Sequence, residues 1–191
     1  MMHFFKNLSQ KVASLYGPRR LLVLLVSAAT FVWLFNFSTV SFSNPSLIEA
    51  SGHEGLLDLM PYYSGPEALA IIGRYGAVGR ELYVQFLVAD FIFVPIYSLG
   101  LALLFTRLLR AVFGDDDGKM WLNLLPLGIG LFDDLENMGT LGMLLTFPET
   151  NLAFGTLASL ATVSKHGMTL VSVVCLVYLG ASLLMRRLKA R

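Results

Sequence analysis

Four carboxylates interrupt stretches of the sequence that are otherwise apolar, namely Asp90, Asp133, Asp134 and Glu136. A charged side chain at the centre of a membrane helix costs about 2.5–3.5 kcal/mol, so acids in such positions mark sites that bind ligands, relay protons or pair with other charges. At most one or two basic residues lie close enough to pair with them. The sequence therefore predicts carboxylates that are protonated, that bind a cation or that stay uncompensated.

Helical spacing gathers the acids of residues 133–136 on one face. At 100° per residue, Asp133 and Glu136 share a stripe about 100° wide with the polar residues Asn137 and Thr140. Asp134 falls to one side of this stripe. The spacing therefore predicts that two of the three acids in this segment point into the interior of a helix bundle.

A second polar face and two bases complete the predicted site. Tyr83, Asp90 and Tyr97 are spaced by seven residues, so two phenols flank the carboxylate on one helix face. Counted from the outer helix ends, Asp90 lies about 12 Å deep and Glu136 about 16 Å deep, which places both in the outer half of a bilayer. Lys165 and Arg80 can extend toward them from the outer ends of their helices. The predicted ligand-binding residues are Asp90, Asp133, Glu136, Asn137, Tyr83, Tyr97, Lys165 and Arg80.

Two other interpretations of these acids remain open. In the first, the acids pair with the nearby bases and tyrosines only to hold the helices in register, because buried polar contacts stabilise membrane bundles by roughly 0.6 kcal/mol each. In the second, Asp133, Glu136 and His166 hold a metal ion, but the sequence lacks the second acidic motif that a magnesium-diphosphate enzyme requires. We therefore predict no catalytic residue, no metal and no cofactor.

The composition indicates where such helices reside. Of the 191 residues, 55% are hydrophobic and 14% are charged, whereas globular domains average roughly 45–50% and about 25%. This excess predicts a membrane protein and excludes a disordered chain or a small disulfide-rich fold. The net charge of +1 gives no support for nucleic-acid binding, and the single Cys175 excludes a disulfide framework. The aromatic residues at 31, 33, 35 and 37 are expected to face lipid or neighbouring helices.

Four segments are long and apolar enough to cross a bilayer, which takes about 20 helical residues. We therefore expect an all-α, polytopic membrane protein, built as a four-transmembrane-helix bundle in a single membrane domain that covers residues 1–191. Outer connections are expected at about 41–81 and 146–164, and a cytoplasmic turn at about 106–120. The first outer connection contains a proline-initiated helix from Pro66 to Tyr75, expected to lie on the membrane as an amphipathic cap. The predicted spans are about 21–40, 82–105, 121–147 and 165–185.

Basic residues outside the spans predict the orientation. Eleven Lys and Arg residues lie on the side of the termini and three, Arg74, Arg80 and Lys165, on the other. Because basic loops stay on the cytoplasmic side, both termini are expected in the cytoplasm, or in the matrix or stroma of an organelle. The first span exceeds the 7–15 residues typical of a signal-peptide core, whereas a mitochondrial address built on the basic N-terminal residues stays open.

Three short motifs stand out in the last three predicted spans: Asp90 to Pro95, the acidic cluster Asp133 to Glu136, and Thr169 to Val173. At these motifs the chain resembles the four-helix sterol-binding membrane proteins of the emopamil-binding protein and sigma-2 receptor group (EXPERA-type proteins). The resemblance implies a lateral cavity for a sterol-like amphiphile, with Asp90 and Glu136 engaging a cationic centre. The chain departs from the isomerase of this group because it has no intramembrane histidine in the second span. The stretch Gly76 to Tyr83 is also similar to uncharacterised small four-span membrane proteins.

These observations favour a multi-pass membrane protein whose outer polar chamber binds a lipid-like or cationic amphiphilic ligand. One alternative is a structural or accessory subunit of a membrane complex, in which the acids only lock the helices. A second alternative is an enzyme that modifies a sterol or lipid, although no catalytic residue is assigned. The expected partners are membrane lipids, a lipid-like small molecule, and either further copies of the chain or a larger membrane complex; nucleic acid is not expected.

Overall fold

A computed structural model describes residues 2–52, 54–114 and 117–189, and these residues form helices and loops without a β-strand. The predicted all-α class is therefore confirmed. The helices are α1 (Met2–Ser14), α2 (Pro18–Phe37), α3 (Asn44–Ser51), η1 (Leu57–Leu59), α4 (Gly65–Arg74), α5 (Gly76–Phe113), α6 (Asp117–Met120), η2 (Trp121–Leu124), α7 (Leu125–Thr146) and α8 (Leu152–Lys189).

Three of these helices, α2, α5 and α8, are long and apolar enough to cross a membrane. They contain most of the predicted spans at 21–40, 82–105 and 165–185. The fourth predicted span corresponds to α7, whose 22 residues include Asp133, Asp134 and Glu136. Those three acids distinguish α7 from α2, α5 and α8, and α7 is not among the helices that qualify as spans by length and composition.

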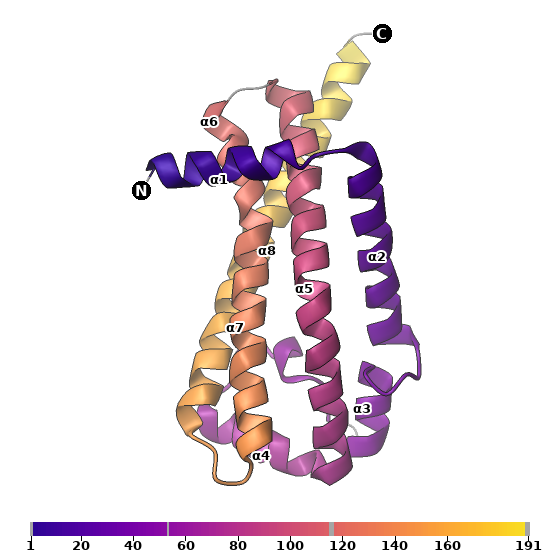
Figure 1. Ribbon diagram of the computed structural model, residues 1–191, viewed down its shortest axis with the longest axis vertical. Coiled ribbons are helices and arrows are strands. Elements are labelled where there is room, and N and C mark those ends of the chain that lie inside the picture. Colours follow the sequence, from indigo (N-terminus) through magenta and orange to yellow (C-terminus); the bar gives the residue numbers. More distant parts are fainter. Residues whose placement is uncertain (1, 53, 115–116, 190–191) are drawn as a thin grey trace.

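The long helices form a bundle with one layer of short elements at each end (Figure 1). Helix α7 packs against both α5 and α8, and α2 packs along α5. Helix α1 lies across the end at which α8 finishes, and we call this end the terminal end. Helices α3 and α4 lie at the opposite end, which we call the distal end.

Small residues permit the close approach of α7 to α8. A Cβ atom at Gly139 would lie 2.9 Å from both the Cβ of Ala158 and the carbonyl oxygen of Phe154. Any side chain at this position would therefore push the two helices apart. This contact lies next to the polar residues of both helices, so it fixes the separation of the groups described below.

Helix α4 begins with a complete capping box. The Ser64 hydroxyl accepts from the Glu67 amide (3.4 Å), and a Glu67 carboxylate oxygen accepts from the Ser64 amide (2.8 Å). This satisfies two backbone donors that a helix start leaves open. Ala68, Ile71 and Ile72 are buried, and α4 packs against α8. The sequence predicted a helix at 66–75, and the observed helix is shifted by one residue.

The helices α5 and α8 are longer than the spans predicted within them. Each has 38 residues, which corresponds to about 57 Å of helix. Most of the connection predicted at 146–164 belongs to α8, which begins at Leu152. The linker between α7 and α8 is therefore short, and the two helices form a hairpin.

Candidate functional site

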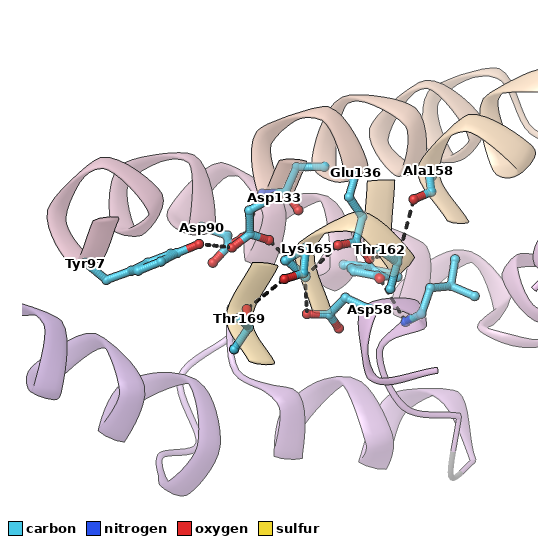
Figure 2. Close-up of polar contacts among 12 residues, drawn as sticks. Asp58, Asp90, Tyr97, Asp133, Glu136, Ala158, Thr162, Lys165 and Thr169 are labelled. Atoms are coloured by element: carbon cyan, nitrogen blue, oxygen red, sulfur yellow. Dashed lines mark hydrogen bonds and ion pairs between the residues drawn. The ribbon is translucent and has the colours of Figure 1, made fainter. Parts of the chain in front are cut away.

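Lys165 is the centre of a buried ionic cluster between α7, α8 and η1. Its Nζ atom lies 3.0 Å from Asp133 Oδ1 and 2.5 Å from Glu136 Oε2, both on α7. The same nitrogen lies 3.8 Å from Asp58 Oδ2 on η1 (Figure 2). Glu136 is only 1% exposed and Lys165 only 8%. Ion pairs so far from solvent depend on complete pairing, because an unpaired charge in such a place is costly.

Hydroxyl groups supply the carboxylates of α7 with further hydrogen bonds. Thr162, one turn before Lys165 on α8, donates to Glu136 Oε1 (2.7 Å). Tyr97 on α5 donates to Asp133 Oδ2 (2.6 Å). Each of the two carboxylates therefore binds Lys165 through one oxygen and a hydroxyl through the other, which holds α5, α7 and α8 together.

Asp90 reaches the cluster through an amide rather than through the lysine. Asn137 Nδ2 on α7 donates to Asp90 Oδ2 on α5 (2.7 Å), and both side chains are buried. No ion pair of Asp90 occurs in the described part of the chain. Asp90 is therefore a buried carboxylate beside the ionic cluster without a cation of its own.

A cavity of about 180 Å³ lies against this cluster. Its polar wall contains Asp58, Asp90, Asp133 and Lys165. Its apolar wall includes three phenylalanine rings that pack on one another, with Phe35 and Phe86 centroids 4.7 Å apart and Phe35 and Phe93 centroids 5.5 Å apart. The remaining lining residues in the described part of the chain are Asn36, Asn44, Leu56 and Leu59.

The electrostatics of the cavity favour a positive ligand. Four carboxylates, those of Asp58, Asp90, Asp133 and Glu136, lie on or next to the cavity, and Lys165 is the basic residue among its lining groups. Asp58 lies outside the long helices, and burial raises the pKa of its carboxyl group more strongly than the Lys165 ammonium lowers it. Aromatic faces carry negative charge density and attract cations. Both walls are therefore suited to a cation.

The cavity lies close to the distal end of α2. Phe35 and Asn36 both line it and are among the last residues of α2, which ends at Phe37. Asn44, at the start of α3, lines it as well. The polar cluster is therefore level with the end of a 20-residue helix and not with its middle.

Six of the eight predicted site residues come together. Asp133, Glu136 and Lys165 form ion pairs, Tyr97 bonds Asp133, and Asn137 bonds Asp90. Tyr83 instead accepts a hydrogen bond from the Leu57 amide (3.0 Å), and so positions the residue that precedes Asp58. Arg80 lies apart, with its guanidinium 4.2 Å above the Phe147 ring.

Sequence reasoning missed Asp58 and the aromatic wall. Asp58 is the one acid within the apolar stretch Leu56 to Met60, and that pattern could have drawn attention to it. Phe35 was expected to face lipid or a helix, and it lines the cavity. Tyr63 also supports this region, because its amide donates to Ser159 Oγ (2.9 Å) and burial raises the pKa of its phenol to about 12.

No family model, curated protein or solved structure matches this chain. The likeness to the emopamil-binding group stays a prediction. Within the described residues, no group of three or more His, Cys, Asp or Glu side chains is arranged to hold a metal ion.

Proposed function

We propose that the protein is a four-span membrane protein whose distal cavity binds the cationic head group of an amphiphile. The observation that carries the proposal is the pairing of an anionic wall with an aromatic wall around one cavity. Carboxylates attract any cation, and stacked aromatic faces add a preference for organic ammonium groups.

The burial pattern of α7 supports a fourth span. Its acids Asp133 and Glu136 point into the bundle and are at most 9% exposed. Its most exposed large side chains, Leu131, Met138 and Leu145, are apolar. Because Asp133 and Glu136 are paired inside the bundle and the outer face of α7 is apolar, these two acids do not prevent α7 from crossing the membrane, and the half-buried Asp134 lies beside them.

The distribution of basic residues supports an orientation with the terminal end in the cytoplasm, or in the matrix or stroma. Arg19 and Arg20 begin α2 at this end, and Arg186 and Arg187 lie in the last turn of α8. In this orientation the cavity lies in the outer leaflet near the head groups. Helices α3 and α4 then form an outer cap, with α4 lying on the membrane surface as an amphipathic helix.

The size of the cavity restricts the ligand. Its volume of about 180 Å³ is smaller than the roughly 300–1,000 Å³ of sites that enclose a whole small molecule. A quaternary or primary ammonium group fits this limit, while an attached alkyl chain stays outside in lipid. Leu59, a lining residue that is 66% exposed, marks the rim at which the chain would leave.

The proposal is tested with decyltrimethylammonium as the probe and protein in a neutral detergent. We expect a rise in the melting temperature and saturable binding by calorimetry, whereas decyl sulfate, with the same chain and opposite charge, gives neither. Asp90→Asn removes one carboxylate from the wall and is expected to weaken binding about tenfold, equivalent to about 1.4 kcal/mol, because it removes the attraction between that carboxylate and the bound cation.

Asp134→Asn is the matched control, because Asp134 is also on an apolar helix but does not line the cavity. Equal binding by the native protein, Asp90→Asn and Asp134→Asn would contradict the proposal. Replacement of Phe86 by Leu tests the aromatic wall and is expected to weaken binding of the quaternary ammonium more than that of decylammonium, since quaternary ammonium groups are the characteristic ligands of aromatic cages.

A second candidate function is that of a structural or accessory subunit of a membrane complex, and the ion pairs of Lys165 favour it. They join α8 to α7 and to η1, as expected for an accessory subunit that needs a rigid bundle. Under this alternative Asp90→Asn changes stability without changing any binding, and mild-detergent isolation yields a defined partner.

A further inference from the structure

A second and larger cavity lies at the terminal end, between α1 and the first turns of α7. Its volume is about 920 Å³, which falls within the roughly 300–1,000 Å³ of ligand sites. Most of its lining is apolar and comes from α1, α6, η2, α7 and one residue of α8. The side chains that define it are those of Leu8, Trp121, Leu124, Leu127, Leu131 and Met168. We call this space the α1 groove.

Helix α1 forms one wall of the groove because its inner face is fastened to the bundle. Val12 and Ala13 are buried, and α1 packs against η2 and α5. Asn123 Nδ2 donates to the Ser9 carbonyl (3.1 Å) and to the Thr106 hydroxyl (3.0 Å), which ties α1 to the bundle end. Phe4 is 65% exposed, so the first turns of α1 present an aromatic side chain outside the bundle.

The chemistry of the lining indicates an amphiphile with a negative head group. Lys6 and His3 are basic residues among the groove's described lining groups. Ser9 also lines the groove, is 2% exposed, and has a hydroxyl without a hydrogen-bond partner in the described part of the chain. An apolar trough with basic groups at one rim matches an acyl chain joined to a phosphate.

The groove is continuous with the surface that α7 turns to lipid. Leu131 lines it and is 59% exposed, and the half-exposed Trp121 lines it at the start of η2. Tryptophan is enriched at the level of lipid head groups. We propose that the α1 groove binds a phospholipid with an anionic head group, taken from the leaflet at the terminal end, with its acyl chain along α7 and its phosphate near Lys6.

This site is separate from the distal cavity and takes a ligand of opposite charge. It uses none of the residues that line the distal cavity. Failure of the ammonium probe to bind would therefore contradict the proposed function but not the phospholipid site. Failure to retain phosphatidylglycerol would contradict the phospholipid site but not the proposed function.

The test uses the full chain in vesicles of equimolar phosphatidylglycerol and phosphatidylcholine with identical acyl chains. After gentle extraction into a neutral detergent, retained lipid is counted by native mass spectrometry. We expect phosphatidylglycerol to be retained about fivefold over phosphatidylcholine, because one basic residue near the surface is worth about 1 kcal/mol toward an anionic lipid. Lys6→Gln is expected to remove this preference.

Lys11→Gln is the matched control, since Lys11 is exposed on the same helix but does not line the groove. Leu131→Trp tests the apolar trough and is expected to lower retention of both lipids, whereas Leu135→Trp, one turn further on α7 and outside the groove, retains them. Equal retention of the two lipids by the native protein, or an equal loss in Lys6→Gln and Lys11→Gln, would overturn the proposal. Circular dichroism confirms that each variant keeps its helices.

Discussion

The two cavities of this bundle are built in opposite ways. The distal cavity is small, and directed contacts around Lys165, with donor and acceptor atoms 2.5–3.0 Å apart, hold its polar wall. The α1 groove is about five times larger and is shaped mainly by apolar side chains. Helix α7 contributes to both, with Leu131 in the groove and Asp133 in the distal cavity. Polar contacts with fixed geometry select a particular group, whereas an apolar trough accepts many chains of similar width.

The largest loss of stability is expected when the lysine at the centre of the ionic cluster is replaced. Lys165→Met leaves Asp133 and Glu136 buried without their partner, and removing one member of a buried ion pair costs about 3–5 kcal/mol. We expect a loss of this size in unfolding by denaturant in detergent. His166→Ala changes the exposed neighbouring residue and should have little effect. An unchanged stability of Lys165→Met would show that the cluster does not hold the distal end.

A smaller loss is expected when one acid of the cluster is neutralised. Glu136 pairs with Lys165 and accepts from Thr162, so Glu136→Gln should cost about 2 kcal/mol through imperfect hydrogen bonding. Asp134→Asn, two residues away, removes a carboxylate for which no hydrogen bond or ion pair occurs in the described residues. In melting curves, we expect Glu136→Gln to lose more stability than Asp134→Asn. Similar losses would contradict a special role for the acids that face the bundle interior.

The charge of Asp58 should make the distal cavity sensitive to pH. Burial raises the pKa of this carboxyl group, so the site loses a negative charge as the pH falls through the raised value. Binding of decyltrimethylammonium should weaken by up to about tenfold, equivalent to 1.4 kcal/mol. Calorimetry between about pH 8 and pH 4 measures this change. Asp58→Asn should bind more weakly at high pH and vary less with pH, and an identical profile would contradict a role for Asp58.

In the absence of decyltrimethylammonium, the contribution of Asp58 to the stability of the protein increases as the pH falls, whereas its contribution to binding decreases. A raised pKa means that the folded chain binds the proton more tightly than the unfolded chain does. This stabilisation is complete below the ordinary aspartate pKa and is lost as the pH rises through the raised value. Melting curves recorded without ligand over the same range provide the control for the binding profile.

The smallest change in the free energy of unfolding is expected from replacing a buried serine at the terminal end. Ser9 has a buried hydroxyl with no partner in the described residues, so Ser9→Ala should change the free energy of unfolding by less than about 0.5 kcal/mol. Asn123→Ala, which removes two hydrogen bonds at the same place, should cost more. A large loss in Ser9→Ala would mean that this end, too, depends on directed polar contacts.

Local patterns predicted much of the bundle and part of the site. The period of the helix alone places Asp133, Glu136 and Asn137 on one face, and the structure brings all three to the cluster. Helix α4 was predicted because its capping residues and proline are adjacent in sequence. Such features need no knowledge of which segments meet.

The parts that were missed depend on contacts between distant segments. Asp58 is brought to Lys165 by the fold of a long connection, and no periodicity describes that path. Arg80 has a side chain long enough to reach either the acids or the Phe147 ring, and spacing cannot choose between them. The α1 groove was not predicted because the basic N-terminal residues were interpreted as a mark of orientation or as a mitochondrial address, and not as a helix that packs on the bundle.

In the proposed four-span arrangement, the hairpin of α7 and α8 has a consequence for how the chain is inserted into a membrane. The acids of α7 emerge from the ribosome before Lys165, which pairs with two of them. Until α8 follows, α7 carries uncompensated charge and is a poor substrate for partition into lipid. The short linker from Phe147 to Asn151 places the lysine beside the acids as soon as α8 is made. We therefore expect α7 to wait in the translocation channel and to enter the bilayer together with α8 as one unit.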